Sequence, residues 1–221
     1  MLNAKSCSPR PAPARSGGFD VAITANEVRH AAARAREAAA LAQDDLNAAD
    51  GKMGDGDTGV MLRRLFEAIA AAIPDQETDI GSVFQACAKA CASGTGSSLG
   101  TLVTVAMMTL AKATKGRGEV GWIELGPLLA SVRDQMMARG GAMLGDKTVV
   151  DMVDAVAVAL VDVRTRKEAA EAARKAVRET LDAFRNRPNR LGRARMFGER
   201  TIGLDDPGML AFSLLLVAVA A

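Results

Sequence analysis

Hydrophobic positions spaced three and four residues apart recur along most of the chain, which is the pattern of amphipathic helices. Segment 60–73 is typical, because its apolar residues fall largely on one helical face: Val60, Leu62, Leu65, Ile69 and Ile73. The same spacing predicts helices over residues 24–49, 60–73, 79–92, 101–113, 123–139, a segment that begins at 148, 165–186 and 209–221. No segment shows a convincing strand pattern, and no internal repeat is evident.

Composition supports an all-α fold. Aromatic residues make up only 3% of the chain, with no Tyr and one Trp, beside long runs of Ala, Leu, Arg and Glu. Such a composition favours helices over a β-sandwich or β-barrel. The length of 221 residues fits one globular domain. We therefore predict an all-α domain of about eight helices over residues 23–221, preceded by a basic, Pro-rich flexible leader at residues 1–22.

Charge and residue counts exclude several classes of function. A net charge of +2 is too small to indicate nucleic-acid binding. The sole histidine, His30, excludes any site that needs two imidazoles and leaves no basis for a zinc enzyme. Three cysteines (Cys7, Cys87 and Cys91) are too few for a disulfide framework, which predicts a reducing, cytoplasmic location. The apolar C-terminal run, residues 209–221, is shorter than the roughly 20 residues of a membrane span, so no membrane association is expected.

The segment 50–59 reads Asp-Gly-Lys-Met-Gly-Asp-Gly-Asp-Thr-Gly and contains three carboxylates: Asp50, Asp55 and Asp57. The glycines permit the tight turns that would bring these carboxylates together. Like charges repel unless a cation joins them, and oxygen ligands suit Mg²⁺ or Ca²⁺. An EF-hand is excluded because, counting from Asp55, Val60 and Phe66 occupy the positions that require Gly and Glu. The remaining alternative is a solvated turn in which Asp57 or Thr58 caps the next helix.

Three further loops are rich in glycine and polar residues. Residues 93–100, Ser-Gly-Thr-Gly-Ser-Ser-Leu-Gly, open onto a predicted helix and resemble an anion site more than a Walker A loop, although a flexible helix–helix turn explains them equally well. Residues 139–148 and 192–208 are long, Gly-dense and rich in Arg, Lys and Asp. If alternate helix connections meet at one end of a bundle, these loops would together form a site for an Mg²⁺-bound nucleotide.

The chain resembles the nucleotide-binding L subunit, or C-terminal domain, of the dihydroxyacetone kinases. Three motifs carry the resemblance: Asp-x4-Asp-x-Asp at 50–57, Gly-Asp-Lys-Thr at 145–148, and Gly-Arg-Ala-x3-Gly-Glu-Arg-x-Ile-Gly-x2-Asp-Pro-Gly at 192–208. The resemblance spans roughly residues 26–221. It implies an antiparallel up-and-down barrel of eight helices, with ADP or ATP bound at one end through two Mg²⁺ ions.

The resemblance also implies residue roles. The metal ligands would be Asp50, Asp55 and Asp57. The nucleotide contacts would be Thr58, Gly59, Val60, Met61, Thr95, Gly96, Gly140, Val149, Arg193, Asp206, Pro207 and Gly208.

In this family, the phosphoryl group passes to dihydroxyacetone or a related short ketose that a separate K subunit holds covalently on a histidine. The chain would thus be a kinase subunit that is inactive alone. In one version of the family ATP exchanges, and in the other bound ADP is rephosphorylated by a phosphocarrier protein of the phosphotransferase system. One departure is Thr58, which stands where the family usually has His. It leaves open an alternative, a nucleotide-loaded module that regulates a partner protein and whose catalysis is impaired.

Overall fold

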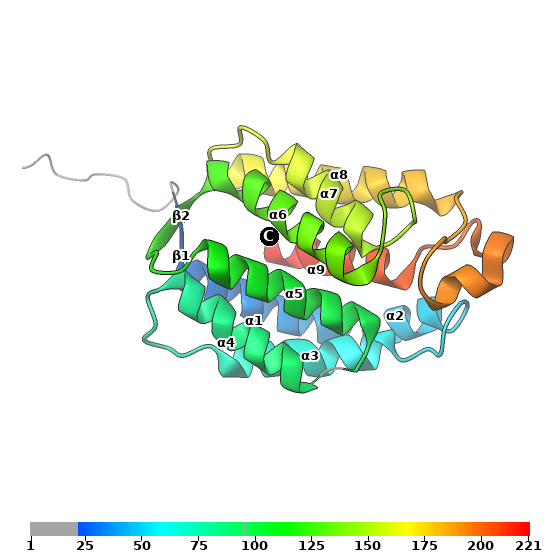
Figure 1. Cartoon of the computed structure of the whole chain (residues 1–221), viewed down its shortest axis with the longest axis horizontal. Helices are drawn as coiled ribbons and strands as arrows, with labels where there is room; N and C mark the ends of the chain where they lie inside the picture. Colours follow the sequence, from blue (N-terminus) through cyan, green and yellow to red (C-terminus); the bar gives the residue numbers. More distant parts are fainter. Residues whose placement is uncertain (1–21, 95) are drawn as a thin grey trace, which may run out of the picture.

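The computed structural model describes residues 22–94 and 96–221, and most of this part of the chain is helical (Figure 1). Its α-helices are α1 (Ala25–Leu41), α2 (Gln43–Asp50), α3 (Thr58–Ala72), α4 (Ile80–Gly94), α5 (Ser98–Ala113), α6 (Leu125–Gly140), α7 (Val149–Ala159), α8 (Arg166–Arg185) and α9 (Pro207–Val219). Two 3₁₀ helices, η1 (Trp122–Glu124) and η2 (Arg193–Thr201), and two strands, β1 (Ala22–Thr24) and β2 (Glu119–Gly121), complete it. The predicted all-α fold is confirmed.

The helices form a closed ring. From α3 to α9 each α-helix contacts the next along the chain, α1 contacts α3, and α1 also contacts α9, which closes the ring. A cavity of about 400 Å³ lies inside it, lined by side chains from α1, α3, α4, α5, α6, α7, α8 and α9. Most of this lining is apolar, as expected for the interior of an antiparallel barrel. The predicted eight-helix arrangement is confirmed when α1 and α2 are taken together as the first helix.

The helix boundaries follow local signals, with two departures. Thr24, Thr148 and Thr165 each form a capping box with the acidic residue three positions later, at the starts of α1, α7 and α8. The helix expected over 24–49 is interrupted at Ala42, which neither Gly nor Pro marks. The segment 191–207, expected as a loop, contains η2.

The two short strands were also not expected. Ala22, Ile23 and Thr24 pair antiparallel with Gly121, Val120 and Glu119. Three residues are too few to show a period-two pattern, so sequence alone gives no signal for this long-range pair. Residues 1–21 of the predicted leader lie outside the described residues, while Ala22 belongs to β1.

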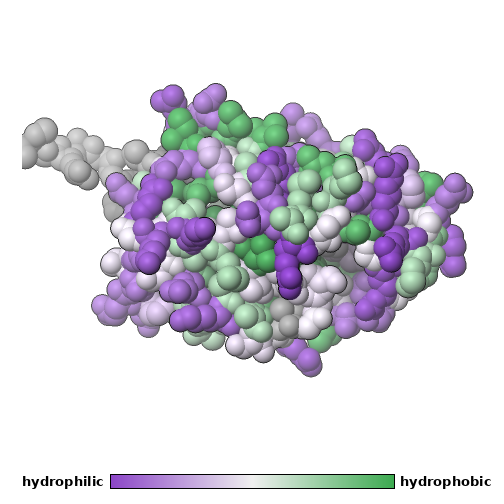
Figure 2. Space-filling model, viewed as in Figure 1, coloured by the Kyte–Doolittle hydropathy of each residue, from purple (hydrophilic) through white to green (hydrophobic). Residues whose placement is uncertain are grey.

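No helix in the described ranges is both long enough and apolar enough to cross a bilayer. On the face drawn in Figure 2, hydrophobic side chains form separate patches, and hydrophilic side chains lie between them.

Four helices begin at the same end of the molecule. In Figure 1 the N-termini of α3, α5, α7 and α9 lie at the end opposite β1 and β2, where η2 (orange) also lies. The up-and-down order of the ring causes this, because every second connection returns to the same end. The described residues of the four polar loops identified in the sequence therefore lie at this end, as expected.

Candidate metal and phosphate site

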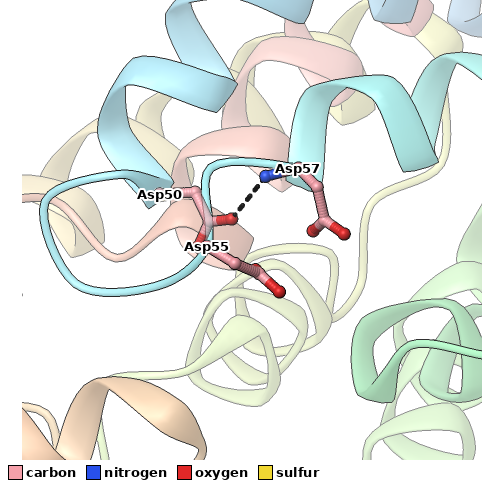
Figure 3. Close-up of side chains that lie close together, drawn as sticks. All are labelled: Asp50, Asp55 and Asp57. Atoms are coloured by element: carbon pink, nitrogen blue, oxygen red, sulfur yellow. Dashed lines mark hydrogen bonds between the residues drawn. The ribbon is translucent and has the colours of Figure 1, made fainter.

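The acidic loop between α2 and α3 brings its three carboxylates together (Figure 3). One oxygen each from Asp50, Asp55 and Asp57 lies within 4.8 Å of the others. Ligand oxygens bound 2.0–2.6 Å from one cation can be at most about 5 Å apart, so this spacing fits a bound divalent ion. Asp50 is buried, whereas Asp55 and Asp57 are exposed and accessible from solvent.

Asp50 also holds the loop in shape. Its Oδ2 accepts hydrogen bonds from the backbone N–H groups of Gly56 (3.0 Å), Asp57 (3.1 Å) and Thr58 (3.3 Å). Asp57 occupies the N-cap position of α3, but its side chain makes no capping hydrogen bond. The simple alternative of a turn capped by Asp57 or Thr58 is therefore wrong in its detail, because Asp50 satisfies the backbone groups at the start of α3 and leaves the Asp57 carboxylate exposed.

Asn47 is a site residue that sequence reasoning missed. From α2, its Oδ1 accepts hydrogen bonds from the N–H groups of Gly59 (2.8 Å) and Val60 (3.2 Å), and so caps α3. Asn is a favoured capping residue, but it usually caps the helix that follows it directly. Here the capping residue lies 12 positions earlier, on another helix, so only the fold reveals its role.

Two glycines permit this close packing. A Cβ at Gly59 would lie 2.0 Å from the carbonyl oxygen of Gln43, and a Cβ at Gly54 would lie 2.2 Å from Oδ1 of Asp50. Real Cβ atoms do not approach other atoms so closely, so a side chain at Gly59 would have to displace backbone, and one at Gly54 would displace the Asp50 carboxylate. Gly59 therefore lets α3 begin against α2, which places Asp57 beside Asp50.

Arg193, at the start of η2, forms an ion pair with Asp55. The hydrogen bond from this guanidinium lowers the pKa of Asp55, and the pair in turn raises the pKa of Arg193. Partial desolvation, together with the charges of Asp55 and Asp50, raises the pKa of Asp57. The cluster thus carries excess negative charge that a cation would relieve.

The starts of three other helices lie together. A Cβ built at Gly208, in the first turn of α9, would be 3.7 Å from Leu99 Cδ1 on α5 and 3.7 Å from Val149 Cβ on α7. A Cβ at Gly140 would lie 3.2 Å from Leu102 on α5. The positive ends of these helix dipoles would attract an anion such as phosphate.

The residues expected to contact the nucleotide have different surroundings in the structure. The backbone N–H of Val60 donates a hydrogen bond to Oδ1 of Asn47. Met61 packs against the hydrophobic core, and Pro207 is buried at the first position of α9. Gly96 lies just before α5, near its N-terminus. Thr95 lies outside the described residues, so its predicted contact stays a prediction.

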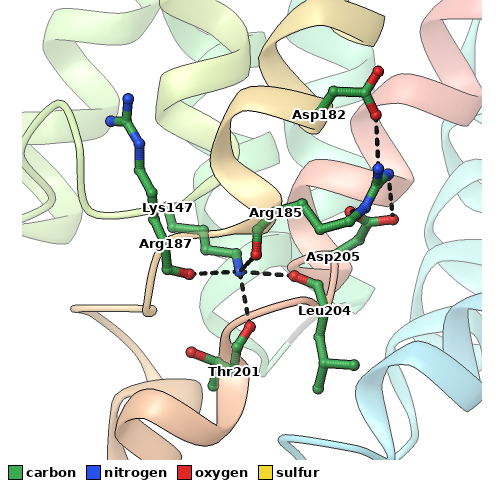
Figure 4. Close-up of polar contacts among 7 residues, drawn as sticks. All are labelled: Lys147, Asp182, Arg185, Arg187, Thr201, Leu204 and Asp205. Atoms are coloured by element: carbon green, nitrogen blue, oxygen red, sulfur yellow. Dashed lines mark hydrogen bonds and ion pairs between the residues drawn. The ribbon is translucent and has the colours of Figure 1, made fainter.

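A buried polar network supports the last two loops (Figure 4). Nζ of Lys147 donates to the carbonyl oxygens of Arg185, Arg187, Thr201 and Leu204 at 2.7–3.2 Å. The sequence motif at 145–148 drew attention to Lys147 without indicating these partners, which lie 38 to 57 residues away.

Asn189 connects this network to α9. Its Nδ2 donates to the carbonyl oxygen of Lys147 (3.0 Å) and to Oδ2 of Asp206 (2.8 Å). Asp206 caps α9, because its Oδ1 accepts from the N–H of Met209 at 3.0 Å. Burial raises the pKa of Asp206 to about 6, despite these hydrogen bonds and the charge of Lys147, which lower it.

The chain is similar in sequence to known proteins. The sequence model of the DAK2 domain matches residues 52–221. The chain is 30% identical over 186 residues to the ADP-binding subunit DhaL of the PEP-dependent dihydroxyacetone kinase of Escherichia coli (strain K12), an alignment that covers 80% of this chain and 87% of that subunit. It is 31% identical over 235 residues to D-erythrulose kinase of Mycolicibacterium smegmatis, covering 98% of this chain and 39% of that protein.

Solved structures show the same fold. The dihydroxyacetone kinase of C. freundii in complex with AMP-PNP and Mg²⁺ matches 100% of this chain with a TM-score of 0.68 at 21% identity. Only 38% of that kinase chain is covered, so the present chain spans about two fifths of the length of this structure and of the erythrulose kinase.

Proposed function

This chain belongs to the DAK2 domain family of the dihydroxyacetone kinases, and we propose that residues 23–221 act as the nucleotide-binding unit of a kinase for dihydroxyacetone or a related short ketose. In this proposal the chain holds ADP or ATP with Mg²⁺ and presents the phosphoryl group to a substrate on a separate K subunit. The observation that carries it is the cluster of Asp50, Asp55 and Asp57, whose oxygens lie within 4.8 Å of one another where four helix N-termini meet.

The carboxylates of Asp50, Asp55 and Asp57 would hold Mg²⁺. The family that the sequence resembles uses two such ions. Bound Mg²⁺ would neutralise charge on the phosphate oxygens and help to orient them. Arg193 already lies beside Asp55 and would place its guanidinium next to the phosphates. The N-termini of α5, α7 and α9 add the positive ends of their dipoles. Phosphoryl transfer requires chiefly such positioning and charge neutralisation.

In this proposal a partner supplies the substrate. The sole histidine, His30, is exposed on α1 and lines the interior cavity together with Trp122 and Arg166. These residues belong to the half of the barrel that carries β1 and β2, away from the acidic loop. His30 is thus unsuited to hold a ketose near the phosphates, which supports the proposal of a separate K subunit.

Thr58 favours a second candidate function. It stands where the resembled family usually has His, and its hydroxyl cannot carry a positive charge or relay a proton as an imidazole does. A chain that binds nucleotide but transfers phosphate poorly could act as a regulatory module on a partner protein. The intact acidic cluster favours the kinase.

The test begins with the purified full chain. We would denature it and identify any released nucleotide and metal by mass spectrometry, then titrate ADP and ATP into nucleotide-free protein with and without Mg²⁺. Asp57→Asn removes one carboxylate charge with little change of shape, and we expect it to abolish the Mg²⁺-dependent part of the affinity. Asp75→Asn, an exposed acid in the turn before α4, is the matched control and should bind as the wild type does.

Activity is then measured with an added K subunit of a dihydroxyacetone kinase. Phosphorylation of the ketose from ATP alone supports the version in which ATP exchanges. Retained ADP, with transfer only when a phosphocarrier protein of the phosphotransferase system is added, supports the other version. Nucleotide binding without any transfer supports the regulatory module. A wild-type chain that neither carries nor binds nucleotide refutes both functions.

A further inference from the structure

Lys147 is an unusual residue for the interior of a protein. Its side chain is only 1% exposed, and it is the largest of the fully buried side chains in the described residues. Desolvation lowers its pKa. Within residues 22–94 and 96–221, no carboxylate forms an ion pair with it, so backbone carbonyl oxygens take the place of a counter-charge. Burial of an ammonium group is unfavourable unless its hydrogen bonds are satisfied, and here all its donors have partners.

The four carbonyls belong to both ends of one chain segment. Arg185 is the last residue of α8 and Arg187 lies just after it, while Thr201 is the last residue of η2 and Leu204 lies just after it. A single ammonium therefore holds together the two ends of the segment 188–203 (Figure 4). Two further hydrogen bonds close the same segment: Gly203 N–H to the carbonyl of Arg185 (2.8 Å) and Asn189 N–H to Oγ1 of Thr201 (2.9 Å).

The backbone of Lys147 is also unusual. Its φ of 63° lies in the left-handed region, which residues with a side chain rarely adopt. This conformation directs its carbonyl to Asn189, whose side chain continues to Asp206. The neighbouring carbonyl of Asp146 accepts from the N–H of Arg190 (3.0 Å). The loop before α7 is thereby joined to both η2 and the start of α9.

The two elements that this clamp fixes both belong to the candidate site. The segment 188–203 carries Arg193, which pairs with Asp55, and Asp206 caps the N-terminus of α9. We propose that Lys147 is a positioning residue for the nucleotide site, whose ammonium holds Arg193 and the start of α9 in register with the acidic loop. This inference rests on the proposed function, because it assigns Lys147 a role in that same site. An apolar residue could fill the same space but could not bind four carbonyls.

The variant Lys147→Met tests this role, because it keeps most of the side-chain volume and removes the ammonium. We expect the dissociation constant of Mg²⁺-bound ADP to rise about tenfold or more, since small displacements of positioning groups have effects of this size. The matched control is Val177→Ala on α8, which removes volume from a fully buried core position without touching the clamp. Val177→Ala should lower the melting temperature and leave the dissociation constant unchanged.

Hydrogen exchange gives a readout that does not depend on nucleotide. In Lys147→Met, the amides of Asn189 and Gly203 should exchange faster than in the wild type, while amides in α3 and α4 keep their wild-type rates. In Val177→Ala, the exchange rates of Asn189 and Gly203 relative to those of α3 and α4 should be the same as in the wild type. If Lys147→Met does not fold, Asn189→Ala, which removes the link between Lys147 and Asp206, carries the same test.

The results separate the two proposals. If Lys147→Met binds Mg²⁺-bound ADP as tightly as the wild type, or loses no more affinity than Val177→Ala at an equal loss of melting temperature, the positioning role is overturned while the proposed function stands. If the wild type does not bind nucleotide, the proposed function fails, and the assignment of Lys147 to a nucleotide site fails with it. Selective loosening of residues 188–203 together with lost affinity supports the inference.

Discussion

An alanine at position 59 would test the packing that builds the acidic site. The added Cβ would lie 2.0 Å from the carbonyl oxygen of Gln43 and 2.8 Å from Oδ1 of Asn47. The first contact involves backbone, so it is relieved only if the start of α3 moves away from α2. That movement also lengthens the hydrogen bonds from Gly59 and Val60 to Asn47.

The magnitude follows from three effects. Loss of the two hydrogen bonds costs about 1 kcal/mol each, and forcing extra volume into a packed contact costs about 1–3 kcal/mol. Alanine is favoured over glycine within a helix by about 1 kcal/mol, which offsets part of this loss. We therefore expect Gly59→Ala to lower the free energy of unfolding by roughly 2–4 kcal/mol.

Urea unfolding of the full chain measures this change, followed both by far-ultraviolet circular dichroism and by the fluorescence of the single tryptophan. Gly94→Ala is the matched control, since a Cβ there meets no atom within 4 Å, and it should leave stability unchanged or raise it slightly. A Gly59→Ala protein that unfolds at the urea midpoint of the wild type would refute the packing argument.

Two further predictions concern titratable groups. Because the folded-state pKa of Asp206, about 6, lies above its ordinary value of 3.8, its contribution to stability is greatest below pH 4 and is lost as the pH rises to 6. The loss amounts to about 3 kcal/mol in the free energy of unfolding. Between pH 4 and pH 7, Asp206→Asn should therefore become more stable than the wild type by about that amount, as measured by urea unfolding. If the free energies of unfolding of the two proteins change in parallel with pH, this prediction is wrong. Burial raises the pKa of the Cys87 thiol to about 12 and that of Cys91 to about 11, so neither should react with iodoacetamide at pH 8 until urea unfolds the chain. Mass spectrometry of the peptides checks this, and rapid labelling of either native thiol would show that it is accessible.

Much of the fold could be read from local patterns. The helical period in segments such as 60–73 and 165–186 predicts where helices form, because one face of each must be buried. Thr148 and Thr165 mark helix starts through their own side chains and those of Asp151 and Glu168, three residues later. The carboxylate pattern at 50–57 likewise depends only on neighbours in sequence, so its convergence could be predicted from the glycines around it.

Other features depend on contacts that no local pattern encodes. The Asn47 cap spans 12 residues, and the hydrogen bonds of Lys147 to Thr201 and Leu204 span 54 and 57. The pairing of β1 with β2 and the closure of the ring by α1 and α9 join parts of the chain still farther apart.

The sequence by itself therefore determined the helices, their order and the chemistry of the loops, because these depend on residues within a few turns of one another. Only the tertiary structure decided that Arg193 lies beside Asp55, that Asp50 both caps α3 and faces the cluster, and that Lys147 is a buried clamp rather than a charged surface residue. The physical reason is that burial and ion pairing are set by which distant segments meet when the ring closes.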